Sequence, residues 1–340
     1  MKHPYFCEAG KPLKPLRPFN TLVAVGGVNY CRRDLCFEEV GSYFLGFKVR
    51  TSRSTQESSG SMNLNDIYRI TSIGRPLDPH YPSNRLVLML LPAAAAVAGT
   101  IAFLRDDVIL EILEAALLAS VVALGSWALA RELAPDVHFV AFVSMVLALG
   151  IFLTVESSSI LILFVALLLV RIVNRTVGLP ARVTDSVLVV SITAWLTYDG
   201  PFPWLGLIGV LAFALDASLE QRLLHQWVFS GVCLVVAGLS FYRHGPYLLE
   251  ESLSRTMVIL LTIIAVGYVL RIWRTRVVKS LSDATGSPLY LSRVRAGMLV
   301  AFWIGLQALT QGQFGIETSS LVWATLAGVS LGGVRFLQSH

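Results

Sequence analysis

The residues of this sequence that could do chemistry are charged side chains beside long apolar stretches. Arg171, Asn174 and Arg175 end one apolar run and, at the spacing i, i+3 and i+4, share one face of a helix. Asp216 and Glu220 share a face in the same way at the end of a later run. An ionisable side chain at the centre of a membrane helix costs about 2.5–3.5 kcal/mol. Charges in such segments are therefore informative about function.

A further acid, Asp185, is expected at a similar depth in the membrane. The apolar residues 186–198 that follow it would rise only about 20 Å, so this helix must extend back to about Pro180 to cross roughly 30 Å of hydrocarbon. By the same argument, the helix that contains Asp216 must extend to about Gln221. If these helices are neighbours, as short connections favour, the two arginines can meet the acids.

Two interpretations fit this cluster. In the first, a polar cavity opens to the cytoplasm and the arginines hold an anionic group; on this interpretation Asp216→Asn abolishes uptake or turnover but not membrane expression. In the second, the charges form a structural network with side chains that reach the membrane surface. Residues 131–138 add Arg131, Glu132, Asp136 and His138 on the same side. The candidate substrate-binding residues are Arg171, Asn174, Arg175, Asp185, Asp216 and Glu220.

A second acidic group is expected on the outer side. Asp107, Glu111 and Glu114 form a helical stripe at the start of an apolar segment. Like charges this close raise one another's pKa, so a protonatable carboxylate here would suit proton or cation coupling. The alternative is a solvated helix start, where acids complement the positive end of the helix dipole.

Sequence motifs give no direct evidence of an enzyme. No P-loop or H-E-x-x-H motif is present, and no D-x-x-x-D motif lies on an expected inner connection. The four cysteines form no CxxC pair. We expect no metal site and no cofactor, and the residues resemble no known family.

The composition decides the class of protein. Of 340 residues, 55% are apolar and only 14% are charged, and the mean hydropathy is +0.67. So few charges cannot cover a soluble protein of this length. The net charge of +5 lies mostly in residues 1–61 and follows no aromatic-basic pattern, so we expect no nucleic-acid partner. The sequence predicts an all-α polytopic transmembrane helix bundle whose main partner is the lipid bilayer.

Hydropathy predicts about ten membrane-spanning helices with short loops in residues 86–335. The expected cores are 86–104, 108–130, 138–154, 158–174, 183–198, 203–219, 226–242, 256–273, 297–311 and 318–335. With both termini in the cytoplasm, the inner segments hold fifteen Lys and Arg residues and the outer segments three. This asymmetry agrees with the positive-inside rule. We expect the cytoplasmic membrane of a bacterium or an archaeon.

The amino-terminal region is a separate part of the chain. Residues 1–61 are expected to be either a disordered cytoplasmic tail or a spurious extension upstream of a natural start at Met62. Residues 62–85 form a cytoplasmic segment before the membrane, and residues 336–340 form a short carboxyl-terminal tail.

Two features suggest partners. The connection within residues 271–295 carries six positive residues and one acid, Asp283, which suits anionic lipids. Gly328 and Gly332 form a G-x-x-x-G pair, which permits close helix approach in a homo-oligomer or within one bundle.

These observations leave three functions open. The first is a transporter of small solutes or lipids, because ten short-looped helices carry polar residues at both faces. The second is a membrane-embedded enzyme that acts on a lipid or isoprenoid at the cytoplasmic face. The third is a non-catalytic assembly or scaffold protein.

Overall fold

The structure is a computed structural model of the whole chain. The chain divides into two units, Met1–Ser61 and Met62–His340. The structure describes residue 68 and residues 70–200, 202–245 and 253–335, with side chains up to Gly332. The predictions made for residues 1–61 and 336–340 lie outside this part of the chain.

The described residues form helices and no strand, which confirms the all-α prediction for them. The α-helices are α3 (Pro82–Leu104), α4 (Ile109–Leu133), α5 (His138–Thr154), α6 (Ile160–Asn174), α7 (Val183–Asp199), α8 (Pro203–Ser218), α9 (Gln226–His244), α10 (Arg255–Arg274), α11 (Leu291–Gln307), α12 (Gly312–Thr318) and α13 (Ser320–Arg335). A 3-10 turn, η1 (Ala308–Gln311), joins α11 to α12.

Ten of these helices overlap the ten predicted segments, and several of their ends differ by a few residues. α11 begins at Leu291 instead of residue 297. α7 begins at Val183 and does not extend back to Pro180, and α8 ends at Ser218 before Gln221. The last two predictions assumed that every helix must span the hydrocarbon by itself, which a helix surrounded by protein need not do.

In the part of the chain that the structure describes, four helices are long and apolar enough to cross a membrane: α3, α4, α9 and α10. The bent pair formed by residues 291–318 and 320–332, with an angle of 92° between its parts, gives a fifth candidate. α5, α6 and α8 are shorter apolar helices. A helix of 15 residues, such as α6, rises about 22 Å.

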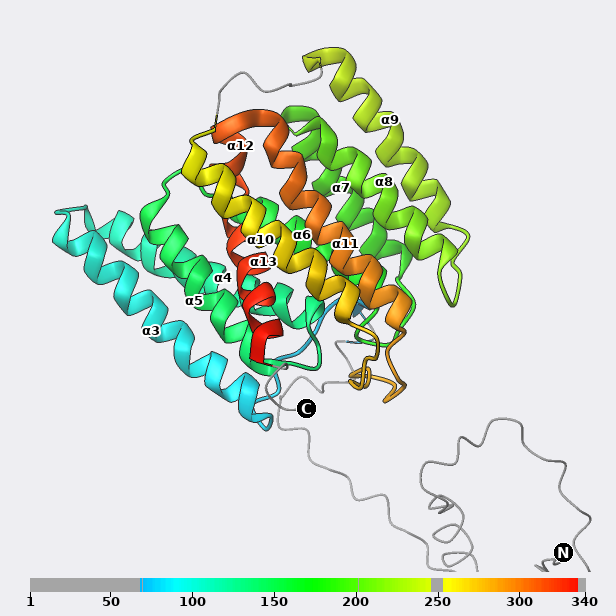
Figure 1. Cartoon of the computed structure of the whole chain (residues 1–340), viewed down its shortest axis with the longest axis horizontal. Coiled ribbons are helices and arrows are strands. Elements are labelled where there is room, and N and C mark those ends of the chain that lie inside the picture. Colours follow the sequence, from blue (N-terminus) through cyan, green and yellow to red (C-terminus); the bar gives the residue numbers. More distant parts are fainter. Residues whose placement is uncertain (1–67, 69, 201, 246–252, 336–340) are drawn as a thin grey trace, which may run out of the picture. The chain divides into compact units, whose positions relative to one another are not determined.

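The long helices and the short helices occupy different places. α3 and α9 lie at opposite edges of the bundle in the view of Figure 1. α3, α4, α9 and α10 carry most of the large apolar side chains that are exposed, such as Leu110, Val235 and Ile263. α6 packs against α4, α8 and α11, and most of its side chains are buried. An apolar exterior around a helical core is the arrangement expected in lipid.

The connections fall into two groups at the two ends of the bundle. In one group, hydrogen bonds tie five segments to one another or to adjacent helix ends: residues 70–81, 134–137, 175–182, 219–225 and 275–290. We call this the arginine-rich end. At the opposite end, the amide of Ser159 donates to the carbonyl of Thr318, and Arg105 donates to the carbonyl of Leu153. The first group is the set of segments predicted to lie inside.

The G-x-x-x-G pair packs within the chain. A Cβ atom added at Gly328 would lie 2.3 Å from Ser144 Oγ, and one at Gly332 would lie 1.8 Å from Val140 Cγ2. Both glycines therefore bring α13 close to α5, which is the packing interpretation of the motif. A second copy of the chain could not use the same surface while α5 occupies it.

Candidate functional site

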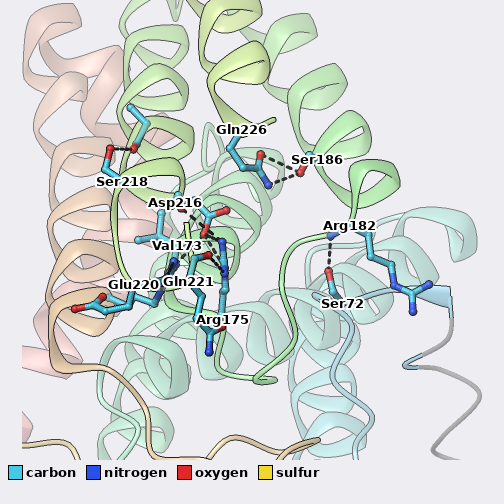
Figure 2. Close-up of polar contacts among 12 residues, drawn as sticks. Ser72, Val173, Arg175, Arg182, Ser186, Asp216, Ser218, Glu220, Gln221 and Gln226 are labelled. Atoms are coloured by element: carbon cyan, nitrogen blue, oxygen red, sulfur yellow. Dashed lines mark hydrogen bonds and ion pairs between the residues drawn. The ribbon is translucent and has the colours of Figure 1, made fainter. Parts of the chain in front are cut away.

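Asp216 is the centre of a buried charge cluster at the arginine-rich end. Its Oδ1 accepts from Arg175 Nε at 2.7 Å and from Arg293 Nη1 at 2.8 Å. The side chains are 4% exposed for Arg175, 2% for Arg293 and 0% for Asp216. Arg175 follows α6 with φ of 50°, Asp216 lies in the last turn of α8 and Arg293 lies in the first turn of α11. The cluster therefore joins three helices; Figure 2 shows Arg175 and Asp216 of this cluster.

Arg175 Nη2 also lies 2.6 Å from Asp216 Oδ1, and further donors of both arginines meet main-chain carbonyl groups. Arg175 Nη1 donates to the carbonyl of Gln221 at 2.9 Å. Arg293 Nη1 donates to the carbonyl of Val173 at 2.8 Å, and Arg293 Nε donates to that of Glu220 at 3.1 Å. The last carbonyl groups of a helix have no partner within it. The arginines satisfy such groups at and just beyond the ends of α6 and α8, so this geometry supports the structural interpretation of the cluster.

Arg171 belongs to a different group, centred on Glu132 of α4. Its Nε lies 3.1 Å from Glu132 Oε1, and Thr176 Oγ1 donates to Glu132 Oε2 at 2.6 Å. Asn174 Nδ2 donates to the Glu132 carbonyl at 2.8 Å. We expected Arg171 to pair with Asp185, Asp216 or Glu220. It does not, because α6 packs directly against the end of α4, where a buried carboxylate is already within reach.

Asp185 binds no arginine in the described structure. Its carboxylate accepts from Thr71 Oγ1 at 2.8 Å, and from the amide and hydroxyl of Ser72 at 2.7 and 2.5 Å. The Ser72 hydroxyl in turn accepts from the amide of Arg182 (Figure 2). Asp185 therefore anchors the segment before α3 to the start of α7.

Glu220 lies just after α8 and is exposed. Its Oε1 accepts from Ser292 Oγ at 2.6 Å. This hydrogen bond lowers the pKa of the Glu220 carboxyl below its ordinary value of 4.5, and the nearby charge of Arg293 acts in the same direction. Glu220 thus links α8 to the start of α11 through its carboxylate, which bonds Ser292, and through its main-chain carbonyl, which accepts from Arg293.

Sequence reasoning missed Arg293 as a site residue, because the helix was expected to begin at residue 297. A core of residues 297–311 rises only about 22 Å, and extending it back by the length argument would have placed Arg293 inside the helix. Asp136 was also missed as a partner: it accepts from the amides of Lys279 and Ser280 at 3.0 and 2.8 Å. No local pattern connects residues so far apart in the sequence.

The segment of residues 281–288 covers the cluster from outside. The amides of Asp283 and Ala284 donate to the carbonyls of Thr176 and Val177, and Arg75 Nη2 donates to Asp283 Oδ1 at 2.9 Å. Burial raises the pKa of the Asp283 carboxyl above 3.8, and the positive charge of Arg75 partly opposes this shift. Gly178, with φ of 89°, lies against Ser282, where any Cβ would collide.

A small polar pocket remains beneath this segment. It is lined by Asn174, Arg175, Ser282, Tyr290 and Arg293 among others, and its volume of about 20 Å³ suits a single water molecule. Asn174 Oδ1 is buried and has no hydrogen-bond partner in the described structure. The pocket is too small for an anionic substrate in this conformation.

The three acidic residues at the opposite end form no ion pair with another side chain among the described residues. Asp107 is half-buried, and Glu111 and Glu114 are exposed. Glu111 Oε2 accepts from the amide of Val108 at 3.3 Å, as an acid in the first turn of a helix commonly does. Within the described residues, no group of His, Cys, Asp and Glu side chains has the arrangement of a metal site.

A second unusual region is the break between α11 and α13. The chain leaves α11 through η1 and then adopts φ of 62° at Gly312. Gln307, Ser320 and Trp323 are 6%, 8% and 3% exposed. Both amide atoms of Gln307, both of Gln311, the Ser320 hydroxyl and the Trp323 indole nitrogen are buried without a hydrogen-bond partner. Buried polar atoms are nearly always paired, so this concentration requires an explanation.

The comparisons with known proteins give no analogue. No family model, no curated protein and no solved structure matches this chain.

Proposed function

We propose that the chain is an integral membrane protein that crosses the bilayer ten times with its arginine-rich end in the cytosol. Four long helices would contact lipid along their length. The six shorter ones would be enclosed by neighbouring helices, so their ends would meet protein instead of hydrocarbon. The excess of arginine in the segments of one end supports the orientation.

Labelling of introduced cysteines by a membrane-impermeant maleimide tests this topology. Tyr242, at the opposite end, is 92% exposed, and Lys279 is an exposed residue at the arginine-rich end. Tyr242→Cys should react in intact cells and Lys279→Cys only after permeabilisation. Equal labelling of both, or the reverse pattern, would overturn the orientation.

We further propose that the protein transports a small polar solute and that the break between α11 and α13 takes part in binding it. The observation that supports this function is the set of buried polar atoms without partners at Gln307, Gln311, Ser320 and Trp323. In the proposed topology this break joins two separate crossings at the end opposite the arginine-rich end, and its polar groups are not all used within η1 and the adjoining helices. A substrate, or the water that replaces it, would satisfy these atoms.

The charge of this region indicates an uncharged solute. Between Gln307 and Trp323 the only ionisable residue is Glu317. Its carboxylate already accepts from Gln313 Nε2 at 2.8 Å. Carboxamide, hydroxyl and indole groups offer both donors and acceptors without a net charge. Neutral molecules with hydroxyl or amide groups match this set.

Uptake into proteoliposomes tests the proposal, with radiolabelled polyols, small amides and inorganic phosphate as probes. At least one neutral probe should enter faster than into empty vesicles. Gln307→Leu/Gln311→Leu should reduce that uptake at least tenfold. Gln313→Leu is the matched control, because Gln313 lies in the same segment and is exposed. No uptake of any neutral probe, or equal loss in both variants, would contradict the proposal.

A second candidate function, a non-catalytic assembly or scaffold protein, is favoured by the Asp216 cluster. Its two arginines direct donors to carbonyl groups of their own chain. A scaffold would show no solute uptake in the same experiment. For a membrane enzyme no comparable observation exists, since the polar pocket beside Arg293 has the volume of one water molecule.

A further inference from the structure

An open groove lies at the start of α3, on the arginine-rich end of the bundle. Its lining residues are Pro79, His80, Pro82, Arg85, Leu86 and Met89, and its volume is about 570 Å³. Volumes of 300–1,000 Å³ are usual for sites that hold small molecules. Unlike the pocket beside Arg293, this groove has room for a headgroup.

The groove has one cationic side and one apolar side. Arg85 is exposed, and no carboxylate pairs with it among the residues that the structure describes. Leu86 is 46% exposed and Met89 is 59% exposed. An apolar surface next to an exposed cation is typical of a site at the boundary between headgroups and acyl chains.

The backbone that forms the groove is held in place by a turn around Asp78. The amide of Tyr81 donates to the Asp78 carbonyl at 3.2 Å, and Asn84 Nδ2 donates to the same carbonyl at 3.1 Å. Asp78 is the nearby acid; its Oδ1 accepts from the amide of His80 at 2.9 Å and lies 2.7 Å from His80 Nδ1. Among the residues that the structure describes, neither Asp78 nor any other carboxylate pairs with Arg85.

We propose that this groove binds an anionic phospholipid of the inner leaflet, with its phosphate beside Arg85 and its acyl chains along Leu86 and Met89. The inference rests on the proposed topology, which places the start of α3 at the cytoplasmic membrane surface. A soluble phosphate compound would use Arg85 but not the apolar side. The apolar half of the lining therefore identifies a lipid as the occupant.

Native mass spectrometry of the detergent-purified protein tests the site, with phosphatidylglycerol and phosphatidylcholine as probes. Phosphatidylglycerol should bind more tightly than phosphatidylcholine. Arg85→Gln should weaken phosphatidylglycerol binding about fivefold, as expected for one interfacial charge, and should abolish the preference. The matched control is Arg105→Gln, because Arg105 is exposed at the other end of the same helix. Equal effects of the two substitutions would overturn the proposal.

A second variant separates a lipid from a soluble phosphate compound. Leu86→Asn/Met89→Gln keeps Arg85 and removes the apolar side, so it should weaken the binding of phosphatidylglycerol. Glycerol 3-phosphate should not compete with the lipid at equal concentration. If it competes fully, or if the double substitution has no effect, the groove is not a lipid site. Cysteine labelling reports separately on the topology, so failure of the site and failure of the membrane orientation give different results.

Discussion

At the residue scale, one carboxylate oxygen determines how three helices meet. Asp216 Oδ1 accepts from two arginines that are almost completely buried. Removing one member of a buried ionic group leaves an uncompensated charge, which typically costs 3–5 kcal/mol. The arginines would then lack a counter-charge at a position without access to solvent. We therefore expect the main role of Asp216 to be in stability.

Asp216→Asn should lower the free energy of unfolding by about 3–5 kcal/mol. Unfolding in mixed micelles of sodium dodecyl sulfate measures this change. Asp199→Asn is the control, because the Asp199 side chain is 59% exposed and lies 3.9 Å from Arg243; exposed pairs contribute less than about 1 kcal/mol. If Asp216→Asn abolishes function at full stability, the binding interpretation of the cluster is correct instead.

Glu220 predicts a specific dependence of stability on pH. The Ser292 hydroxyl lowers the pKa of the Glu220 carboxyl in the folded protein. Their hydrogen bond therefore stabilises the fold fully above pH 4.5, and this stabilisation is lost as the pH falls through the lowered pKa. Ser292→Ala should therefore destabilise the protein at pH 6 by more than at pH 3. Melting temperatures at these two values measure the difference.

The control for this prediction is Ser218→Ala. The Ser218 hydroxyl donates only within its own helix, to the carbonyl of Ala214. Its removal should have the same effect at both pH values. A pH-independent loss in Ser292→Ala would show that the Glu220 charge is not involved.

At the element scale, the helices were predictable and their mutual packing was not. The apolar runs located ten helices, but only the structure places α13 against α5 and α6 against the end of α4. The spacing of glycines in α13 signals close packing with some helix. It carries no information on which helix that is, because contact depends on the arrangement of the whole bundle.

Gly328→Ala tests this packing. An added Cβ would lie 2.6 Å from Ser144 Cα, so α13 and α5 must separate, and overpacking of this kind costs about 1–3 kcal/mol. Gly231→Ala in α9 is the matched control, because nothing lies within 4 Å of its added Cβ. It should stabilise the helix by up to about 1 kcal/mol. A loss of stability in Gly328→Ala together with a gain in Gly231→Ala would support the packing. A gain of stability in both variants would contradict it.

At the scale of the whole molecule, the proposed membrane orientation predicts which tryptophans contact lipid. Trp303 of α11 is 50% exposed, whereas Trp323 of α13 is 3% exposed. Brominated lipids quench the fluorescence of indole rings that touch acyl chains. Trp303→Phe should therefore reduce the quenchable fraction of the emission, and Trp323→Phe should leave the quenched signal almost unchanged. Equal losses would show that the surface around Trp303 does not face lipid.

The sequence by itself determined the class of the fold, the ten helical segments and the separation of the charges into two groups. These properties depend on hydrophobic periodicity and on local composition, which act over about twenty residues at a time. Part of the charge cluster was also predictable: Arg175 and Asp216 do pair. This pairing was predictable because short connections favour neighbouring helices, whose charged ends can then meet.

Only the tertiary structure decided which partner each charge takes. Arg171 binds Glu132, Asp185 binds Ser72, and Arg293 completes the group around Asp216. The physical reason is that a hydrogen bond forms only when donor and acceptor lie about 3 Å apart, so partner choice depends on helix packing and not on sequence spacing. For the same reason, the break between α11 and α13 and the groove at Arg85 emerge only from the assembled helices.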